Sequence, residues 1–141
     1  MGNALVPELA VSDWQISRAF YCDLVGFEVA YERPEEGFSY LVLGDAQLMI
    51  DQIGIGRTFE IDEAPLERPF GRGLNLQIRV PDVSAILQRF SAAGVPLYLP
   101  LEEKWYRRGD REVGNRQFVV PDPDGYLLRL YGDLGERDLD R

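Results

Sequence analysis

Apolar and polar positions repeat in the same order twice along the chain. A helix-like pattern covers 14–25 between Asp13 and Gly26, and a second one covers 83–93 between Asp82 and Gly94. In both copies the Asp is placed to accept from the free backbone N–H groups of the first turn, and the Gly to end the helix in a left-handed conformation. Apolar spacing predicts two buried helix faces, formed by Ile16, Phe20 and Leu24 and by Val83, Ile86, Leu87 and Phe90.

Strand-like patterns surround each predicted helix. In the first half they cover 6–11, 27–32, 38–43 and 46–51, with Gly44-Asp45 as a turn. In the second half they cover 74–80, 95–99, 116–120 and 126–131, with Asp122-Pro123-Asp124-Gly125 as a turn. We therefore expect an α+β fold in a single domain, 1–141, made of two βαβββ modules at about 4–52 and 73–132. The stretch 53–72 is interpreted as a linker, and the charged residues 133–141 as a fraying tail.

Composition and charge narrow the function. The 141 residues include 15 basic and 24 acidic side chains, a net charge of −9, which disfavours nucleic acid and favours a cationic ligand. Histidine is absent, so neither a histidine metal site nor a His-activated nucleophile is expected. The single cysteine, Cys22, forms no internal disulfide, and neither a membrane-spanning run nor a signal-peptide pattern is present. These features predict a cytoplasmic protein that interacts with no membrane.

Three motifs carry a family resemblance. They are Val11-Ser12-Asp13 followed by Leu24-Val25-Gly26-Phe27, then Val80-Pro81-Asp82, and finally Asp122-Pro123-Asp124-Gly125-Tyr126. In this order and spacing the chain resembles the vicinal-oxygen-chelate superfamily, which includes glyoxalase I, extradiol dioxygenases and bleomycin resistance proteins. The resemblance implies two βαβββ modules whose mixed sheets curl into open cups, often completed in a homodimer.

The resemblance also implies a test for a metal site. Enzymes of this superfamily hold a divalent metal with His, Gln or Glu at four strand positions, which here contain Val6, Met49, Asn75 and Arg129. Only Asn75 offers a hard oxygen ligand, and a single carbonyl does not hold such an ion. We therefore expect no metal, no cofactor and no catalytic residue of the family's usual kind.

Strand alternation predicts what lines the cups instead. If Leu43 pairs with Ala46, one face of the first hairpin carries Phe38, Tyr40, Gln47, Met49 and Asp51. Pairing Pro123 with Tyr126 likewise groups Phe118, Val120, Arg129 and Tyr131. The segment 97–110 is interpreted as a loop that presents the adjacent aromatics Trp105 and Tyr106. This mixture is typical of a ligand site, although a half-solvated face or one covered by a dimer partner explains it as well.

The phrases Val6-Pro7-Glu8-Leu9, Tyr31-Glu32-Arg33-Pro34 and Gly114-Asn115-Arg116-Gln117-Phe118 resemble the bleomycin resistance branch. This branch implies a cytoplasmic homodimer that sequesters its drug unaltered. Our leading hypothesis is a non-enzymatic binder of bleomycin-like or other aromatic cationic compounds. Its expected ligand contacts are Phe38, Tyr40, Asp51, Glu32, Trp105, Tyr106, Phe118 and Arg129. The alternatives are an enzyme of the same fold, with Tyr40 or Glu8 as acid or base, and a sensor or partner-binding module.

Overall fold

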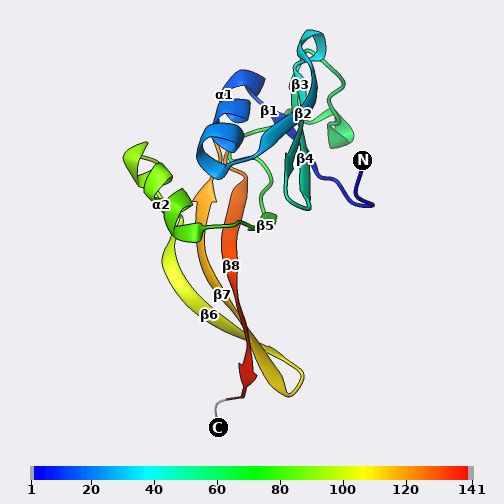
Figure 1. Ribbon diagram of the computed structural model, residues 1–141. Helices are drawn as coiled ribbons and strands as arrows, with labels where there is room; N and C mark the ends of the chain where they lie inside the picture. Colours follow the sequence, from blue (N-terminus) through cyan, green and yellow to red (C-terminus); the bar gives the residue numbers. More distant parts are fainter. Residues whose placement is uncertain (1, 140–141) are drawn as a thin grey trace. The chain divides into compact units, whose positions relative to one another are not determined.

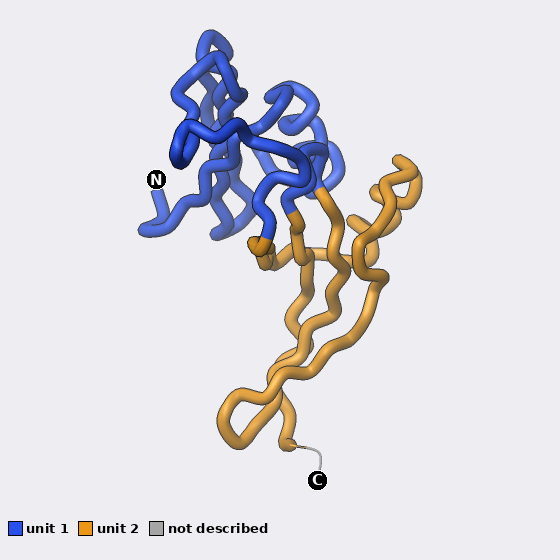
Figure 2. The backbone as a smooth tube through the Cα atoms, turned by 180° about the vertical axis from the view of Figure 1, so that it is seen from behind, with its two compact units in different colours: residues 1–72, 122–126 blue, residues 73–121, 127–141 orange. Residues whose placement is uncertain are grey.

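The computed structural model describes residues 2–139 and divides into two compact units (Figure 2). Unit 1 contains the chain up to Arg72 together with Asp122–Tyr126, and unit 2 contains Gly73–Pro121 and the chain from Leu127 onward. Each unit is built on one four-stranded mixed sheet and one α-helix (Figure 1). The arrangement confirms the predicted α+β class with two βαβββ modules.

Unit 1 contains the first module and the stretch predicted as a linker. Its elements are β1 (Glu8–Val11), α1 (Trp14–Ala19), the π-helix η1 (Phe20–Val25), β2 (Glu28–Arg33), the 3-10 turn η2 (Pro34–Glu36), β3 (Phe38–Leu43), β4 (Ala46–Gln52) and the 3-10 turn η3 (Ile61–Glu63). The strand order is β1-β4-β3-β2, with β1 parallel to β4 and the other pairs antiparallel. The pairing of Leu43 with Ala46 confirms the predicted register of the β3–β4 hairpin.

The first helix begins and ends where the sequence predicts. The Asp13 carboxylate accepts from the backbone N–H groups of Gln15 and Ile16, and Gly26 ends the helix with φ +107°. The buried face differs from the predicted stripe, because Ile16 is 56% exposed. Phe20 is buried as predicted, and Leu24 is half-buried. The buried face also includes Trp14, Ser17, Tyr21 and Val25, with Tyr21 held by a buried hydrogen bond.

That hydrogen bond belongs to a buried network around Asp122. The Tyr21 hydroxyl donates to the Asp122 carboxylate over 2.6 Å, and the backbone N–H groups of Asp124 and Tyr126 donate to its other oxygen. Burial raises the pKa of Asp122, and these hydrogen bonds oppose that rise. Burial and the nearby carboxylates raise the pKa of Tyr126 to about 12. The network fixes the shape of the 122–126 turn.

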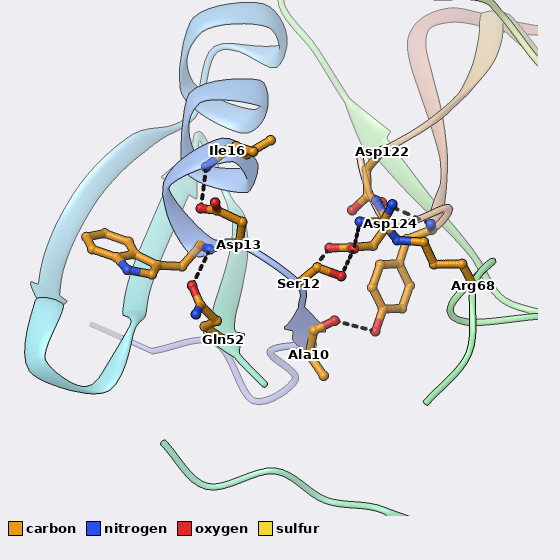
Figure 3. A network of polar contacts seen from close by, with 10 residues as sticks. Ala10, Ser12, Asp13, Ile16, Gln52, Arg68, Asp122 and Asp124 are labelled. Carbon is orange, nitrogen blue, oxygen red and sulfur yellow. Dashed lines mark hydrogen bonds and ion pairs between the residues drawn. The ribbon is translucent and has the colours of Figure 1, made fainter. Parts of the chain in front are cut away.

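Asp124 ties the same turn to the start of the first helix (Figure 3). Its carboxylate accepts from the backbone N–H and the hydroxyl of Ser12, and from Arg68 at 2.9 Å. The Tyr126 hydroxyl donates to the carbonyl oxygen of Ala10 in β1. Asp124 is only 1% exposed, so its charge depends on these donors. The closing motif of the family resemblance therefore acts as a structural clamp within unit 1.

Unit 2 contains the second module. Its elements are β5 (Asn75–Arg79), α2 (Val83–Ala92), β6 (Leu99–Arg108), β7 (Arg111–Pro121) and β8 (Leu127–Asp138), and its strand order is β5-β8-β7-β6. The Asp82 carboxylate caps α2 by accepting from the backbone N–H of Ala85. Val83, Ile86 and Phe90 are buried, as predicted.

Two sequence-based boundaries in unit 2 are wrong. The predicted strand at 95–99 is irregular up to residue 98, and β6 runs instead through the segment predicted as a loop. The expected fraying tail continues β8 as far as Asp138. These strands carry charged, exposed residues, so they lack the apolar alternation by which strands are recognised. Backbone pairing continues along them, with Trp105 opposite Gly114 and Arg111 opposite Asp138.

The predicted register of the second hairpin is wrong by one residue. Pro121 pairs with Leu127 and Phe118 with Leu130, so Phe118 and Arg129 lie on opposite faces of the sheet. Asp122 causes the shift, because its carboxylate collects two backbone donors and enlarges the turn. Phe118 consequently packs against Phe90 of α2, with ring centroids 5.8 Å apart.

Candidate functional site

The open face of the unit 1 sheet collects the residues that the β3–β4 register predicted. Phe38 pairs with Asp51, and Tyr40 pairs with Met49. Parallel pairing with β1 adds Glu8 beside Met49 and Ala10 beside Asp51. Side chains alternate between faces along a strand, so these six residues share one surface while Leu41, Leu48 and Ile50 are buried on the helix side. The face therefore combines aromatic rings with two carboxylates.

The aromatic rings form a continuous row. Tyr31 of β2 stacks on Tyr40, with ring centroids 5.1 Å apart, and lies 5.9 Å from Phe38. The guanidinium of Arg33 lies 4.0 Å from the centroid of Phe38. Arg33 also forms an ion pair with Glu36 in the turn after β2. A planar cation thus already covers one ring of the row.

Two cavities open beside this row. One, of about 250 Å³, is lined by Arg33, Glu36, Phe38 and Gly56, and the other, of about 190 Å³, by Ala10, Thr58, Leu66 and Tyr126. Both are also lined by Glu8, Asp51, Arg57 and Phe59. The stretch predicted as a linker therefore supplies a wall of the candidate site.

The two carboxylates of this face have few local partners. Burial is the largest cause that raises the pKa of both Glu8 and Asp51, with further contributions from Asp51 on Glu8 and from Glu36 on Asp51. Arg33 opposes both rises. The Oδ1 atom of Asp51 is buried and has no hydrogen-bond partner among residues 2–139. A buried, unsatisfied carboxylate oxygen is costly in the free protein and is ready to accept from a ligand.

Gly56 explains how the loop approaches that oxygen. A Cβ atom added at Gly56 would lie 2.8 Å from Asp51 Oδ1 and 3.0 Å from the Glu36 carbonyl oxygen. Only a residue without a side chain fits there without a shift of its neighbours. The loop thus comes close to Asp51 while leaving its oxygen unpaired.

The open face of the unit 2 sheet is arranged differently. Gln117 is 1% exposed, and its amide nitrogen donates to Glu102 and to the Tyr106 hydroxyl, each at 2.8 Å. Asn115 donates to the Gln117 amide oxygen, and Arg129 makes a long 3.4 Å hydrogen bond to Tyr106. The Nε atom of Arg129 is buried without a partner in the described chain. Most polar groups on this face therefore satisfy one another.

Two of the expected ligand contacts, Glu32 and Phe118, lie on the helix side of their sheets. Glu32 accepts from Arg18 at 2.9 and 3.0 Å and from the Ser39 hydroxyl, on the helix side of the sheet. Phe118 is fully buried under α2. Both corrections have the same physical reason. Glu32 forms an ion pair and Phe118 packs against another ring on the helix side of the sheet, so neither side chain is available on the open face.

Trp105 and Tyr106 do not form the adjacent pair that a loop would present. They are consecutive residues of β6, so their side chains point to opposite faces. Tyr106 lies with Gln117 and Arg129, whereas the Trp105 ring lies against Gly114 and under the Arg137 guanidinium, 4.0 Å from it. Phe38, Tyr40 and Asp51 share the unit 1 face, and Tyr106 and Arg129 share the unit 2 face.

Sequence reasoning did not find Arg33, Arg57 or Phe59. Arg33 follows the strand pattern by one residue, and its position over Phe38 depends on the β2–β3 pairing of these two residues. Arg57 and Phe59 lie in an irregular segment without periodicity, where their cation–π contact at 4.9 Å leaves no sequence signal. Glu8 was detectable from alternation along β1.

The residues present do not fit a metal ion. At three of the four positions that the family resemblance marks for metal ligands, Val6 offers no donor, Met49 only a thioether, and Arg129 a cation. Within the described part of the chain, no group of three or more Cys, Asp or Glu side chains is placed to hold a metal. None of the described helices is long and apolar enough to cross a membrane.

Comparison with known proteins finds similar sequences and solved structures. A bleomycin resistance protein of Geobacillus stearothermophilus is 24% identical, over 92% of this chain and 96% of its own length. The crystal structure of TioX from Micromonospora sp. ML1, also 24% identical, covers 98% of this chain and 100% of its own with a TM-score of 0.68. A superfamily member from Vibrio splendidus 12B01 is 39% identical, over 90% and 95% of the two chains, with a TM-score of 0.41.

The match to TioX supports the fold, and the family model gives the assignment. Residues 4–130 match the model described as Glyoxalase/Bleomycin resistance protein/Dioxygenase superfamily. That match covers most of the chain and includes both modules. The protein therefore belongs to the glyoxalase/bleomycin resistance protein/dioxygenase superfamily.

Proposed function

We propose that this protein is a non-enzymatic binding protein that sequesters aromatic, cationic small molecules of the bleomycin type. The observation that carries the proposal is the unit 1 face. There Asp51 Oδ1, a buried carboxylate oxygen without a hydrogen-bond partner among the described residues, adjoins the Phe38 ring and a cavity of about 250 Å³. Aromatic surface beside unsatisfied carboxylate complements a planar, positively charged ligand. The curated relative named as a bleomycin resistance protein supports the same class.

The proposal assigns roles to particular residues. Phe38, which is 4% exposed beneath Arg33, and Tyr40, which is 7% exposed beneath Tyr31, are the proposed stacking rings. Asp51 with Glu8 is proposed to meet positive charge. Tyr106 and Arg129 remain proposed contacts because they present a hydroxyl and a half-buried guanidinium on the open face of the unit 2 sheet. We also propose that the protein acts as a cytoplasmic homodimer. Light scattering of the protein as it elutes from a size-exclusion column measures its molar mass and so tests the dimer. Sequestration requires only affinity and abundance.

Calorimetric titration of metal-free bleomycin into the purified protein tests the proposal. We expect saturable binding with one drug per protomer, weakened about tenfold in Asp51→Asn through the loss of a partly buried charge contact. Phe38→Leu keeps the core filled while removing the stacking surface, and should weaken binding by about twofold to tenfold.

Two matched variants control this titration. Asp45→Asn removes one negative charge from the exposed hairpin turn, and Tyr98→Leu removes an aromatic ring that is 71% exposed in unit 2. Neither should change the affinity. Absence of heat at high micromolar drug would contradict the ligand assignment, and equal weakening by Asp45→Asn would show that only net charge matters.

A second function is favoured by one observation. Glu8 and Asp51 line both cavities and have raised pKa values, as a carboxylate that acts as a general acid or base requires. An enzyme of this superfamily without the usual metal site is therefore the alternative proposal. Mass spectrometry of the drug after prolonged incubation separates the two functions, because sequestration leaves its mass unchanged.

A further inference from the structure

Arg33 covers the ring that a ligand would use. Its guanidinium carbon lies 4.0 Å from the Phe38 centroid and 5.9 Å from that of Tyr31. The 4.0 Å distance is short enough for a planar cation to stack on the Phe38 ring, whereas the distance to Tyr31 is near the outer limit of about 6 Å for a cation–π contact. The structure thus contains a bound guanidinium on this face, supplied by the chain itself.

The side chain of Arg33 is only lightly held in this position. It is 44% exposed, and its ion-pair partner Glu36 is 49% exposed. An ion pair between two such exposed groups contributes little to stability. Both residues border the η2 turn, and β2 is an edge strand of its sheet, so the side chain can swing into solvent without breaking the sheet.

The surroundings favour a cation whether or not Arg33 is there. Glu8, Glu36 and Asp51 line one cavity together with the Phe38 ring. Arg33 opposes the rise in the pKa of both Glu8 and Asp51, so it acts as their counter-charge. Asp51 Oδ1 still lacks a hydrogen-bond donor among the residues described. When Arg33 leaves, an incoming cation finds ring surface and three carboxylates.

We infer that the Phe38 face beside Asp51 is a subsite for a guanidinium or amidinium group, which Arg33 occupies in the free protein and which a ligand enters by displacing Arg33. The inference deepens the proposed function and rests on it only for the identity of the complete ligand. Arg33 is accordingly a specificity-determining residue that lowers the affinity of every cation reaching this ring. A ligand must bind the Phe38 ring more favourably than the Arg33 guanidinium does.

Ethylguanidinium and ethylammonium at equal ionic strength are the probes that test the subsite. They carry the same charge, but only ethylguanidinium is planar and able to stack. In Arg33→Ala, amide chemical shifts of Phe38 and Asp51 should titrate with ethylguanidinium, with about threefold to tenfold higher affinity than in the unaltered protein. Ethylammonium should produce smaller shifts.

Two other Arg→Ala variants separate stacking from charge. Arg57→Ala removes a positive charge from the same cavities but leaves Phe38 covered, since Arg57 stacks on Phe59. Arg137→Ala removes a cation–π contact of equal 4.0 Å distance on Trp105, in unit 2. Neither should gain the selective response to ethylguanidinium.

Each result decides the inference. A selective gain confined to Arg33→Ala supports it, even if bleomycin itself binds no variant, in which case only the proposed drug is wrong. An equal gain in affinity for ethylguanidinium in Arg57→Ala would show that the effect comes from the loss of one positive charge and would overturn the inference. It would also be overturned if Arg33→Ala showed no response to ethylguanidinium, or if that variant bound bleomycin more weakly than the unaltered protein.

Discussion

The two sheets share one topology and differ in how the polar groups on their open faces are satisfied. On the unit 2 face, Gln117 holds Glu102 and Tyr106 by hydrogen bonds of 2.8 Å. On the unit 1 face, Asp51 keeps a buried oxygen without a partner in the described chain, and Glu8 is its diagonal neighbour on the adjacent strand β1. The first arrangement resembles a satisfied core, whereas the second leaves interactions for a ligand to complete.

This difference shows that the two modules share one backbone arrangement although the side chains on their open faces differ. Both modules begin their helix at a capping Asp and place a parallel strand beside the last strand of a hairpin. Equivalent pairs on the open faces contain Tyr40 with Met49 in one unit and Val119 with Arg129 in the other. Function must therefore be argued from each face separately.

The largest expected effect, on the free energy of unfolding, concerns Phe118, which the sequence pattern groups with Phe38 as a ligand contact. Phe118→Ala should lower the free energy of unfolding by about 4 kcal/mol, because it removes a fully buried ring packed on Phe90. The drug affinity of the folded fraction should stay unchanged. Urea unfolding with calorimetry measures both quantities.

Phe38→Leu is the matched comparison. It should cost about 1 kcal/mol of stability, since an aliphatic side chain still fills most of the space. It should nevertheless weaken binding. If Phe118→Ala weakened binding per folded molecule, the two faces would not be functionally distinct and the comparison would fail.

The sequence predicts the fold well because periodicity and capping are local. Asp13, Gly26, Asp82 and Gly94 bound the helices through contacts within a few residues, and the β3–β4 register follows from a short turn. The second hairpin was predicted one residue out of register, because the Asp122 carboxylate shapes its turn through a buried network that includes distant Tyr21. Alternation alone contains no information about such a network.

The candidate site was predictable only in part, for the same reason. Phe38, Tyr40 and Asp51 follow from alternation on one hairpin. Glu32 pairs with Ser39 in the β2–β3 register, which places it on the helix side of the sheet, where it accepts from Arg18 of α1. The cavity walls supplied by Arg57 and Phe59 depend on an irregular loop whose path is set by tertiary contacts.

A smaller effect should come from the centre of the unit 2 face. Gln117→Leu keeps the volume but removes the amide that bonds to Glu102 and Tyr106, so it should cost about 2 kcal/mol of stability. Tyr106→Phe removes one of these contacts and should cost about half as much. Urea unfolding of both variants and of the double variant gives the coupling between them. Additive losses would show that the amide and the hydroxyl do not act as one network.

The smallest effect distinguishes the unit 1 face by its pH dependence. The pKa of Asp51 is raised in the folded protein, chiefly by burial, so above that folded value its ionised carboxylate costs stability in full. As pH falls through the folded pKa, the native state takes up the proton first and the cost decreases. It vanishes below the ordinary carboxyl value of about 4. Asp51→Asn should therefore stabilise the protein near neutral pH by less than about 1 kcal/mol, and the gain should disappear in acid.

Unfolding curves of Asp51→Asn and the unaltered protein, subtracted at each pH, isolate the contribution of the Asp51 charge together with its coupling to Glu8 and Glu36. Carboxylates that do not interact with Asp51 contribute equally to both proteins. Asp45→Asn, at an exposed turn, should give a difference close to zero throughout. A variant less stable than the unaltered protein at neutral pH would mean that the Asp51 carboxylate gains more from Arg33 than it loses by burial. The unit 1 face would then be satisfied as the unit 2 face is, and no unmet acceptor would remain there for a ligand. A small stabilisation by Asn is thus the thermodynamic sign that Asp51 is kept for binding rather than for folding.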